Sequence, residues 1–172
     1  MINDEPSIHA DRLRLRPCRA DDLDLLHKLW TEAGVRRFLF DDCSISREEA
    51  RSFIEASATT FANHGYGLWL FSEHQCDLIA GFAGLFHSSE ESSSLLFGTR
   101  PQLWGRGYAG EAAGAVLRHA FEVLRLECVV ADVNEPNVAS IRVIEKLGMT
   151  RTRCAIVNER PLLYYRICAS AR

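Results

Sequence analysis

The residues whose types and spacing point most directly to chemistry form a glycine-rich loop in the second half of the chain. The loop follows a short apolar run, residues 95–99, and opens a long segment with helical periodicity, residues 107–124. A strand, a glycine loop and a helix in this order present backbone N–H groups and the positive end of a helix dipole to an anion. We therefore expect the loop to bind a pyrophosphate or a similar anion. Its residues are Gln102, Leu103, Trp104, Gly105, Arg106, Gly107, Tyr108 and Ala109.

Two classes of ligand fit this loop. The spacing Gly105-x-Gly107-x-x-Gly110 matches a dinucleotide-binding fingerprint, with Asp132 where a ribose-binding acid would be. In a dinucleotide fold, however, the first glycine directly follows its strand, whereas residues 101–104 intervene here. Read from Gln102, the same stretch is Gln-x-x-Gly-x-Gly, which resembles the acyl-CoA pyrophosphate loop of the GCN5-related N-acetyltransferases (GNAT). This context favours acetyl-CoA over a dinucleotide.

Length and composition are those of an ordinary soluble protein. The chain has 172 residues, of which 47% are apolar and 25% charged, and we expect one domain over residues 1–172. A net charge of −3 gives no reason to expect a nucleic-acid partner. The polar, acidic start of the chain does not resemble a signal peptide, and no apolar run approaches the length of a membrane span. We therefore expect a cytoplasmic monomer or homodimer without a membrane partner.

The cysteines show no paired spacing that would indicate a metal site or a disulfide. No CxxC motif occurs, so we interpret them as reduced cytosolic thiols, mostly small core residues. No cluster of His, Asp and Glu has ligand spacing either, and we predict no metal. The six cysteines are Cys18, Cys43, Cys76, Cys128, Cys154 and Cys168.

The elements that must position the loop follow from the spacing of apolar residues. Strands are expected over residues 12–16, 66–71, 78–86, 95–99, 127–133, 149–155 and 162–167. Helices are expected to begin at Asp21 or Asp22, at the capping-box sequence after Ser46, near Gly107 and after Asn137. Hairpins early and βα units late predict an α/β (α+β mixed) fold. About seven strands form a mixed, mostly antiparallel sheet that about four helices flank.

Three segments together resemble the GNAT family, from Arg12 to the last strand. Their order and spacing indicate the ribosomal-protein N-acetyltransferase-like (RimJ/RimL-like) branch. The resemblance implies the GNAT fold, in which two central strands splay apart and admit the pantetheine arm of acetyl-CoA. The segments are residues 12–17 with 21–23, residues 104–112, and residues 134–140 running into 145–149.

The resemblance also implies which residues bind acetyl-CoA. Phe97, Gly98 and Thr99 would pair with the pantetheine, and the main chain of residues 102–109 would hold the pyrophosphate. Asn134 and Asn137 lie at the family's cofactor-side turn, although a turn asparagine and a helix N-cap explain them equally well.

The residue that protonates the leaving thiolate is predicted from the same resemblance. Many family members place a tyrosine seven residues after the turn asparagine, but this chain has Ile144 there, which cannot donate a proton. The ribosomal-protein branch has a serine three residues after the asparagine, and Ser140 matches it. The alternative is an ordinary helix serine bonded to its own backbone.

The base that deprotonates the acceptor amine is less clearly marked. Family members often have a glutamate just before the pantetheine-pairing residues, where this chain has Ser94. Glu91 acting through a water molecule and His87, a residue type that commonly acts as a general base, are the candidates. Direct loss of the proton to solvent is a third route.

The sequence therefore predicts transfer of an acetyl group from acetyl-CoA to a primary amine by direct attack in a ternary complex. The amine would belong to a protein N-terminus or to a small molecule, and the first two helices and last two strands would build its pocket. A catalytically weak acyl-CoA-binding sensor is the second hypothesis. A nucleotide-dependent oxidoreductase, resting on the dinucleotide fingerprint, is the third.

Overall fold

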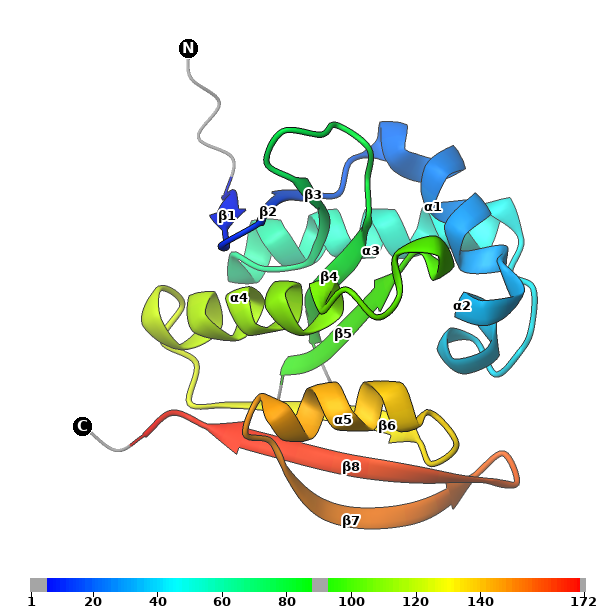
Figure 1. Ribbon diagram of the computed structural model, residues 1–172, viewed down its shortest axis with the longest axis vertical. Coiled ribbons are helices and arrows are strands. Elements are labelled where there is room, and N and C mark those ends of the chain that lie inside the picture. Colours follow the sequence, from blue (N-terminus) through cyan, green and yellow to red (C-terminus); the bar gives the residue numbers. More distant parts are fainter. Residues whose placement is uncertain (1–5, 88–92, 171–172) are drawn as a thin grey trace.

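A single mixed sheet organises the computed structural model shown in Figure 1, which describes residues 6–87 and 93–170. Over these residues the sheet has eight strands in the order β1-β2-β3-β4-β5-β6-β8-β7. Neighbouring strands are antiparallel except β5 and β6, which are parallel. The predicted mixed, mostly antiparallel sheet flanked by helices is confirmed.

The elements have the following bounds. The strands are β1 Ile8–His9, β2 Leu13–Pro17, β3 Leu68–Glu73, β4 Gly81–His87, β5 Ser93–Thr99, β6 Cys128–Asn134, β7 Thr150–Val157 and β8 Arg160–Cys168. The α-helices are α1 Leu23–Thr31, α2 Ala33–Leu39, α3 Arg47–His64, α4 Tyr108–Glu122 and α5 Val138–Lys146. Two short 3-10 helices, η1 Ala20–Asp22 and η2 Pro101–Leu103, precede α1 and α4.

Two elements in the described residues were not predicted. Strand β1 has two residues and is held by pairing with β2, so it has no periodicity of its own to read. Helix α2 has seven residues in a segment that we expected to be a connection. The capping box before α3 is confirmed, because Ser46 and Glu49 exchange side-chain and backbone hydrogen bonds.

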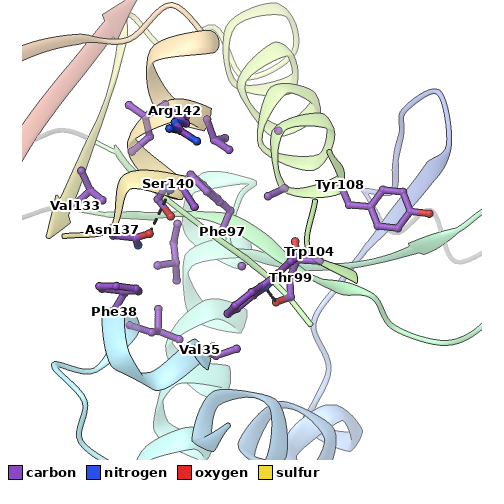
Figure 2. Close-up of a pocket in the computed structure, with 18 of the residues that line it drawn as sticks. Val35, Phe38, Phe97, Thr99, Trp104, Tyr108, Val133, Asn137, Ser140 and Arg142 are labelled. Atoms are coloured by element: carbon purple, nitrogen blue, oxygen red, sulfur yellow. Dashed lines mark hydrogen bonds between the residues drawn. The ribbon is translucent and has the colours of Figure 1, made fainter. Parts of the chain in front are cut away.

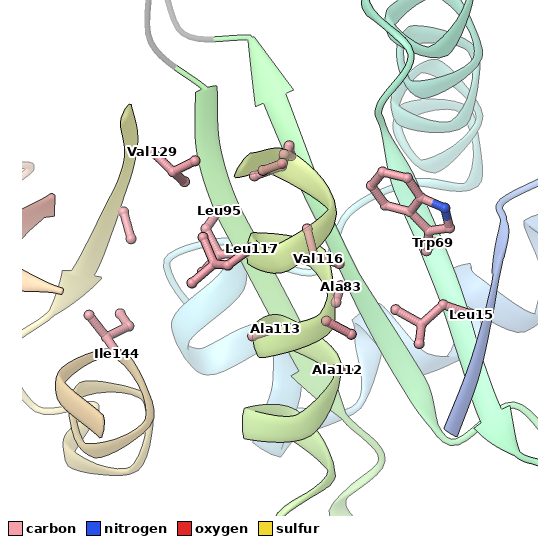
Figure 3. Close-up of a cluster of buried hydrophobic side chains, with 14 of the residues drawn as sticks. Leu15, Trp69, Ala83, Leu95, Ala112, Ala113, Val116, Leu117, Val129 and Ile144 are labelled. Carbon is pink, nitrogen blue, oxygen red and sulfur yellow. The ribbon is translucent and has the colours of Figure 1, made fainter. Parts of the chain in front are cut away.

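The core lies on both faces of the sheet. Strand β3 is buried on both sides, with Trp69 and Phe71 in the cluster beneath α4 and α5, and Leu68 and Leu70 in the cluster beneath α1 and α3. Figure 3 shows the first cluster, in which the inner side of α4 lies against the sheet. That side of α4 includes Ala112, Ala113, Val116 and Leu117, all buried. The small alanines allow the helix to lie close to the strands.

Strands β5 and β6 separate toward their C-terminal ends. They pair only at Ser93 with Val129 and at Ser94 with Val130. Beyond that point β5 stays paired with β4 as far as Thr99, and β6 stays paired with β8 as far as Asn134. Each strand keeps its outer neighbour while the inner edges diverge, and the predicted splayed central pair is confirmed.

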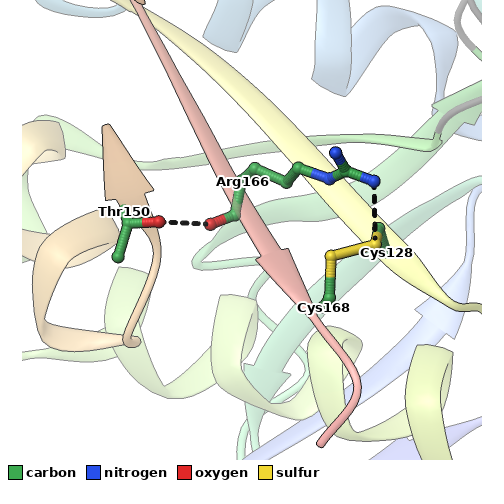
Figure 4. Close-up of a disulfide and its surroundings, with 4 residues drawn as sticks. All are labelled: Cys128, Thr150, Arg166 and Cys168. Carbon is green, nitrogen blue, oxygen red and sulfur yellow. Dashed lines mark hydrogen bonds between the residues drawn. A yellow bond between two sulfur atoms is a disulfide. The ribbon is translucent and has the colours of Figure 1, made fainter. Parts of the chain in front are cut away.

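The interpretation of the cysteines was wrong. Cys128 and Cys168 form a disulfide, shown in Figure 4, because antiparallel pairing of β6 with β8 places them directly opposite each other. Their sequence separation of 40 gives no local pattern from which this pairing can be read. Of the four free thiols only Cys18 is buried, so the expectation of mostly core cysteines was also wrong.

Reduction of this disulfide is expected to lower thermal stability. Closing a segment of 40 residues stabilises a fold by roughly 4 kcal/mol in the chain-entropy model, which corresponds to a shift in Tm of roughly 10 °C. Thermal unfolding with and without reductant measures the shift, and Cys168→Ser should reproduce it. The control Cys76→Ser removes an exposed free thiol and should leave Tm unchanged. Equal Tm values with and without reductant would contradict the pairing.

None of the helices in the described part of the chain is long and apolar enough to cross a membrane.

Candidate functional site

A cavity of about 700 Å³ opens where β5 and β6 diverge. Figure 2 shows it between the N-terminal ends of α4 and α5 and the helix α2. The two strands contribute Leu95 to Thr99 and Asp132 to Asn134 to its lining. The splay therefore leaves an open space rather than one closed by side chains. Helix α2 contributes Gly34, Val35, Phe38 and Leu39, and the start of α5 contributes Asn137, Ala139, Ser140, Arg142, Val143 and Ile144.

The glycine loop forms the end of this cavity next to α4. Gly105 and Gly107 have φ angles of 78° and 79°, in the left-handed region that glycine adopts without strain. Gly107 is the N-cap of α4, and no side chain caps the helix. Its first N–H groups are therefore left for a ligand or for solvent. A Cβ added to Gly105 would meet no atom within 4 Å, so the loop backbone faces open space. This arrangement fits a pyrophosphate.

The chain reaches the loop through η2 rather than directly from β5. That connection differs from the strand-to-glycine junction of a dinucleotide fold. Trp104, which follows η2, donates a hydrogen bond from Nε1 to the carbonyl of Thr99 at 2.9 Å. This contact ties the loop to the end of β5.

Arg12, just before β2, holds the other side of the loop. Its Nε donates to Glu111 in the first turn of α4 at 2.7 Å, and its Nη1 donates to the carbonyl of Arg106 at 3.0 Å. Its guanidinium also lies over the ring of Tyr108, 4.8 Å from the centroid. The Tyr108 hydroxyl in turn donates to Glu73 at the end of β3. Arg12 was not predicted as a site residue, because Arg12, Arg14 and Arg16 all alternate with leucines in the same way.

Replacing Arg12 by alanine is expected to weaken acetyl-CoA binding roughly tenfold, because charge-assisted hydrogen bonds that order the loop are lost. The side chain of Glu111 is only 14% exposed, and without the Arg12 side chain its carboxylate loses its ion pair and keeps only the hydrogen bond from the backbone N–H of residue 12. Isothermal titration calorimetry measures the effect. The control is Arg14→Ala in β2, which removes contacts to Ser72 and Asp77 and none to the loop. Equal losses for both variants would contradict a role for Arg12 in the loop.

Phe97, Gly98 and Thr99 line the cavity along the edge of β5 that has no strand partner there. Packing alone also favours glycine at position 98, since an added Cβ would lie 2.5 Å from the ring of Phe82. The hydroxyl of Thr99 is buried without a hydrogen-bond partner. The structure thus places all three residues on the unpaired edge of β5 that lines the cavity.

Asn137 and Asn134 line the cavity and also have structural partners. Asn137 caps α5 by accepting a hydrogen bond from the backbone N–H of Ser140 at 3.2 Å. Asn134 donates to the carbonyl of Phe38 at 3.5 Å and so connects β6 to α2. The N-cap interpretation of Asn137 is therefore correct, and the cavity position leaves a second role open to both side chains.

Ser140 lies in the cavity with its hydroxyl free of partners in the described residues. The hydroxyls of Ser52, Thr59 and Thr60 in α3 instead donate to carbonyls four residues earlier. The alternative of a serine bonded to its own helix is thus not what the structure shows. Ile144, one turn further along, is buried and provides an apolar wall.

Three predicted site residues in the described part of the chain, Gln102, Arg106 and His87, lie outside the cavity lining. Gln102 and Arg106 belong to the loop but are exposed outside the lining. His87 stacks on His64, with ring centroids 4.9 Å apart, at the end of β4 opposite Ser93. That end is where β5 and β6 are still paired. Glu91 lies outside the described residues.

Two charged residues of the cavity were missed or given another role. Arg142 lines it from α5, and Figure 2 shows its guanidinium on the same side as Ser140. Asp132 was considered only as a ribose-binding acid, but it lines the cavity from β6. The residue is exposed to solvent inside the cavity. The surrounding walls nevertheless partly desolvate its carboxyl group, and this raises the pKa of the carboxyl above its ordinary value. No pattern in the sequence predicts that either residue lines the cavity, because their positions depend on how far β5 and β6 diverge.

Comparisons with known proteins agree with this geometry. The family model described as acetyltransferase (GNAT) domain matches residues 12–150. The FsC-acetyl coenzyme A-N(2)-transacetylase of Aspergillus fumigatus is 27% identical over 165 residues, which cover 87% of this chain and 67% of that protein.

Solved structures show the same fold. An acetyltransferase from Agrobacterium tumefaciens has a TM-score of 0.84 at 23% identity and covers 98% of both chains. The structure of RimL, a ribosomal L7/L12 alpha-N-protein acetyltransferase in complex with coenzyme A, has a TM-score of 0.81 at 18% identity. The match covers 96% of this chain and 99% of that one. With the family match over most of its length, the chain belongs to the GNAT acetyltransferase family.

Proposed function

We propose that the protein transfers an acetyl group from acetyl-CoA to a primary amine, by direct attack within a ternary complex. The amine belongs to a protein N-terminus or to a small molecule. The observation that carries the proposal is the cavity between β5 and β6, which has uncapped helix N–H groups at one end and an unpaired strand edge along one wall. These features match a diphosphate and an extended amide-containing arm joined in one molecule.

The roles of the binding residues follow from this placement. The main chain of residues 102–109 binds the pyrophosphate, and Phe97, Gly98 and Thr99 pair with the pantetheine. Asn134 and Asn137 contact the same arm from the opposite wall. Family membership supports acetyl-CoA as co-substrate, and the RimL structure is described as a complex with coenzyme A.

The chemistry needs little beyond alignment and two polar groups. Holding the amine in line with the thioester carbonyl supplies up to roughly 7–11 kcal/mol of barrier reduction. A backbone N–H near Phe97 polarises the carbonyl. The hydroxyl of Ser140 donates a proton to the departing thiolate, since it lies in the cavity without another partner in the described residues.

Both acceptor classes have support among the relatives. RimL is named for acetylating the α-amine of a ribosomal protein, and another solved structure with this fold is named as a chimera of a spermidine N-acetyltransferase from Vibrio cholerae. The likeness to RimL agrees with the predicted ribosomal-protein branch at the level of fold.

Calorimetry and a thiol-release assay test the proposal together. Acetyl-CoA and CoA should bind, and NAD should not. Free thiol should then appear in step with acetylated product for at least one amine in a panel of N-terminal peptides and polyamines. Initial rates with both substrates varied should give the intersecting lines of a ternary complex. Binding without thiol release from any amine would favour the acyl-CoA sensor instead, and parallel lines would indicate an acetylated enzyme.

A further inference from the structure

Elements on both faces of the sheet line the cavity. The glycine loop and α5 lie on the face whose core contains Ala112, Val116 and Ile144. Helices α1, α2 and α3 cover the other face, whose core includes Leu26, Val35 and Ile54. Since acetyl-CoA is assigned to the first face, an acceptor that meets the thioester within the splay must enter from the second.

Asp132 lies on this second face. Ser94 and Val130 are the last residues paired between β5 and β6, and paired residues of a parallel ladder point to the same side. Leu96 and Asp132 are each two residues further on, so they point to that side from opposite edges of the gap. Leu96 packs against the core cluster beneath α1 and α3, which identifies the side.

The carboxylate of Asp132 has no ion pair and no side-chain hydrogen-bond partner among the described residues; it bonds only with its own backbone. Val35 and Phe38 of α2 line the same cavity and are apolar. A second hollow of about 340 Å³ shares Phe38 and Asn134 with the cavity and is also lined by Arg37, Asp42, Pro136, Arg160 and Pro161. Within the cavity itself, a carboxylate that has no ion pair and shares its walls with apolar residues of α2 is suited to receive a cation.

We propose that Asp132 is the catalytic base, which binds the acceptor as an ammonium ion and takes its proton. The inference rests on the proposed function. The neutral amine then attacks the thioester carbonyl, a C–N bond forms, the C–S bond breaks, and the sulfur leaves with the electron pair. The thiolate takes the Ser140 proton, and the second proton lost from the nitrogen restores the hydroxyl. The proton on Asp132 passes to solvent, so one proton is released for each acetyl group transferred.

Asp132→Asn tests this role, because asparagine has nearly the same shape as aspartate but cannot act as a base. We expect kcat at saturating acetyl-CoA to fall about a hundredfold or more, as for loss of a general base, while the Kd for acetyl-CoA is unchanged. The control Glu135→Gln removes an exposed carboxylate from the turn after β6, outside the cavity lining, and should retain wild-type turnover. Wild-type turnover in Asp132→Asn would overturn the assignment.

A second acceptor separates a base from a residue that only shapes the pocket. Methoxyamine is already neutral at neutral pH, so its acetylation does not need a base for the first proton. Most of the loss caused by Asp132→Asn should therefore disappear with methoxyamine, and an equal loss with both acceptors would overturn the role. If the wild-type protein acetylates no amine at all, the proposed function fails as well, which is a distinguishable result.

The pH dependence provides an independent readout. Turnover should fall as the pH drops through the pKa of Asp132, and this limb should be absent in Asp132→Asn. The charged or titratable groups around Asp132 in the described residues are Tyr164, its register partner on β8, Arg153, 3.7 Å above the Tyr164 ring from β7, and Arg142, which lines the cavity from α5. Arg37, Asp42 and Arg160 line the adjoining hollow. The limb should survive Tyr164→Phe, and its persistence in Asp132→Asn would overturn the proposal.

Thermal unfolding shows whether the substitution damages the fold. Folding raises the pKa of Asp132, so the ionised carboxylate costs stability above that pKa, and asparagine removes the cost. The Tm of Asp132→Asn at neutral pH should thus equal or exceed that of the wild type. If Tm falls instead, Asp132→Ser with added formate decides the matter: rescue of turnover supports the base, and its absence overturns it.

Discussion

Gly107→Val is expected to weaken acetyl-CoA binding at least about a hundredfold. With a φ of 79°, Gly107 adopts a conformation that costs a β-branched residue about 1–3 kcal/mol. An added Cβ would meet only the end of the Arg12 side chain, at 3.5 Å, so the protein itself has room for it. The loss of affinity arises in the complex, where main-chain hydrogen bonds to the anion are lost, and these contribute about 1.5–3 kcal/mol each. Calorimetry with acetyl-CoA measures the loss.

The matched control is Gly148→Val. Gly148 has a φ of 87° after α5 and lies outside the cavity lining, so valine there imposes a similar backbone strain away from the ligand. Both variants should lose stability by a similar amount, and only Gly107→Val should lose affinity. Unchanged affinity in a folded Gly107→Val protein would count against the loop as the pyrophosphate site.

Ser140→Ala is expected to lower kcat about a hundredfold while changing the Kd for acetyl-CoA little. A positioned proton donor contributes about 10²- to 10⁴-fold in rate. The cap of α5 is retained, because Asn137 accepts from the backbone N–H of residue 140 and not from its side chain. Steady-state kinetics and calorimetry on the same preparation separate the effect on turnover from the effect on affinity.

Ser52→Ala is the control for the general effect of losing a helix hydroxyl. Ser52 is exposed on α3, donates to the carbonyl of Glu48 and is not part of the cavity lining. It should retain full activity. Full activity of Ser140→Ala would remove Ser140 from the mechanism, and an equal loss of affinity and turnover would indicate a binding role instead.

Most of the fold follows from local patterns in the sequence. The alternation after Arg12 and the capping box at Ser46 both have the structural consequences expected of them. These signals depend on neighbouring residues alone. Strand β1 and helix α2 escaped prediction because two and seven residues are too few for a period to show, and tertiary contacts determine their structure.

The candidate site also combines features that local sequence patterns predict with features that depend on the assembled fold. The glycine loop and the cap at Asn137 are local, and the sequence predicts both. Arg12 contacts Glu111 across 99 positions of sequence, and no spacing rule predicts such a contact. The place of Asp132 depends on how far β6 diverges from β5, which only the assembled sheet determines. The disulfide escaped for the same reason, since strand pairing brings its two sulfurs together.

The proposed alignment of the substrates depends on a sheet in which two neighbouring strands, β5 and β6, are unpaired toward their C-terminal ends. Continued pairing of β5 and β6 to their ends would bring more backbone hydrogen bonds but would close the cavity. The surrounding contacts keep the gap open, because β4 and β8 hold the outer edges of the two strands and α4 and α5 pack above them. Binding of an extended arm would then satisfy the exposed edge of β5.

A crystal structure of the protein with CoA tests the central claim most directly. The account predicts the diphosphate within hydrogen-bonding distance of main-chain N–H groups between Gly105 and Ala109, and the pantetheine running beside Phe97 to Thr99 with its sulfur near Ser140. CoA bound elsewhere on the surface, or strands β5 and β6 closed against each other with the ligand excluded, would contradict it.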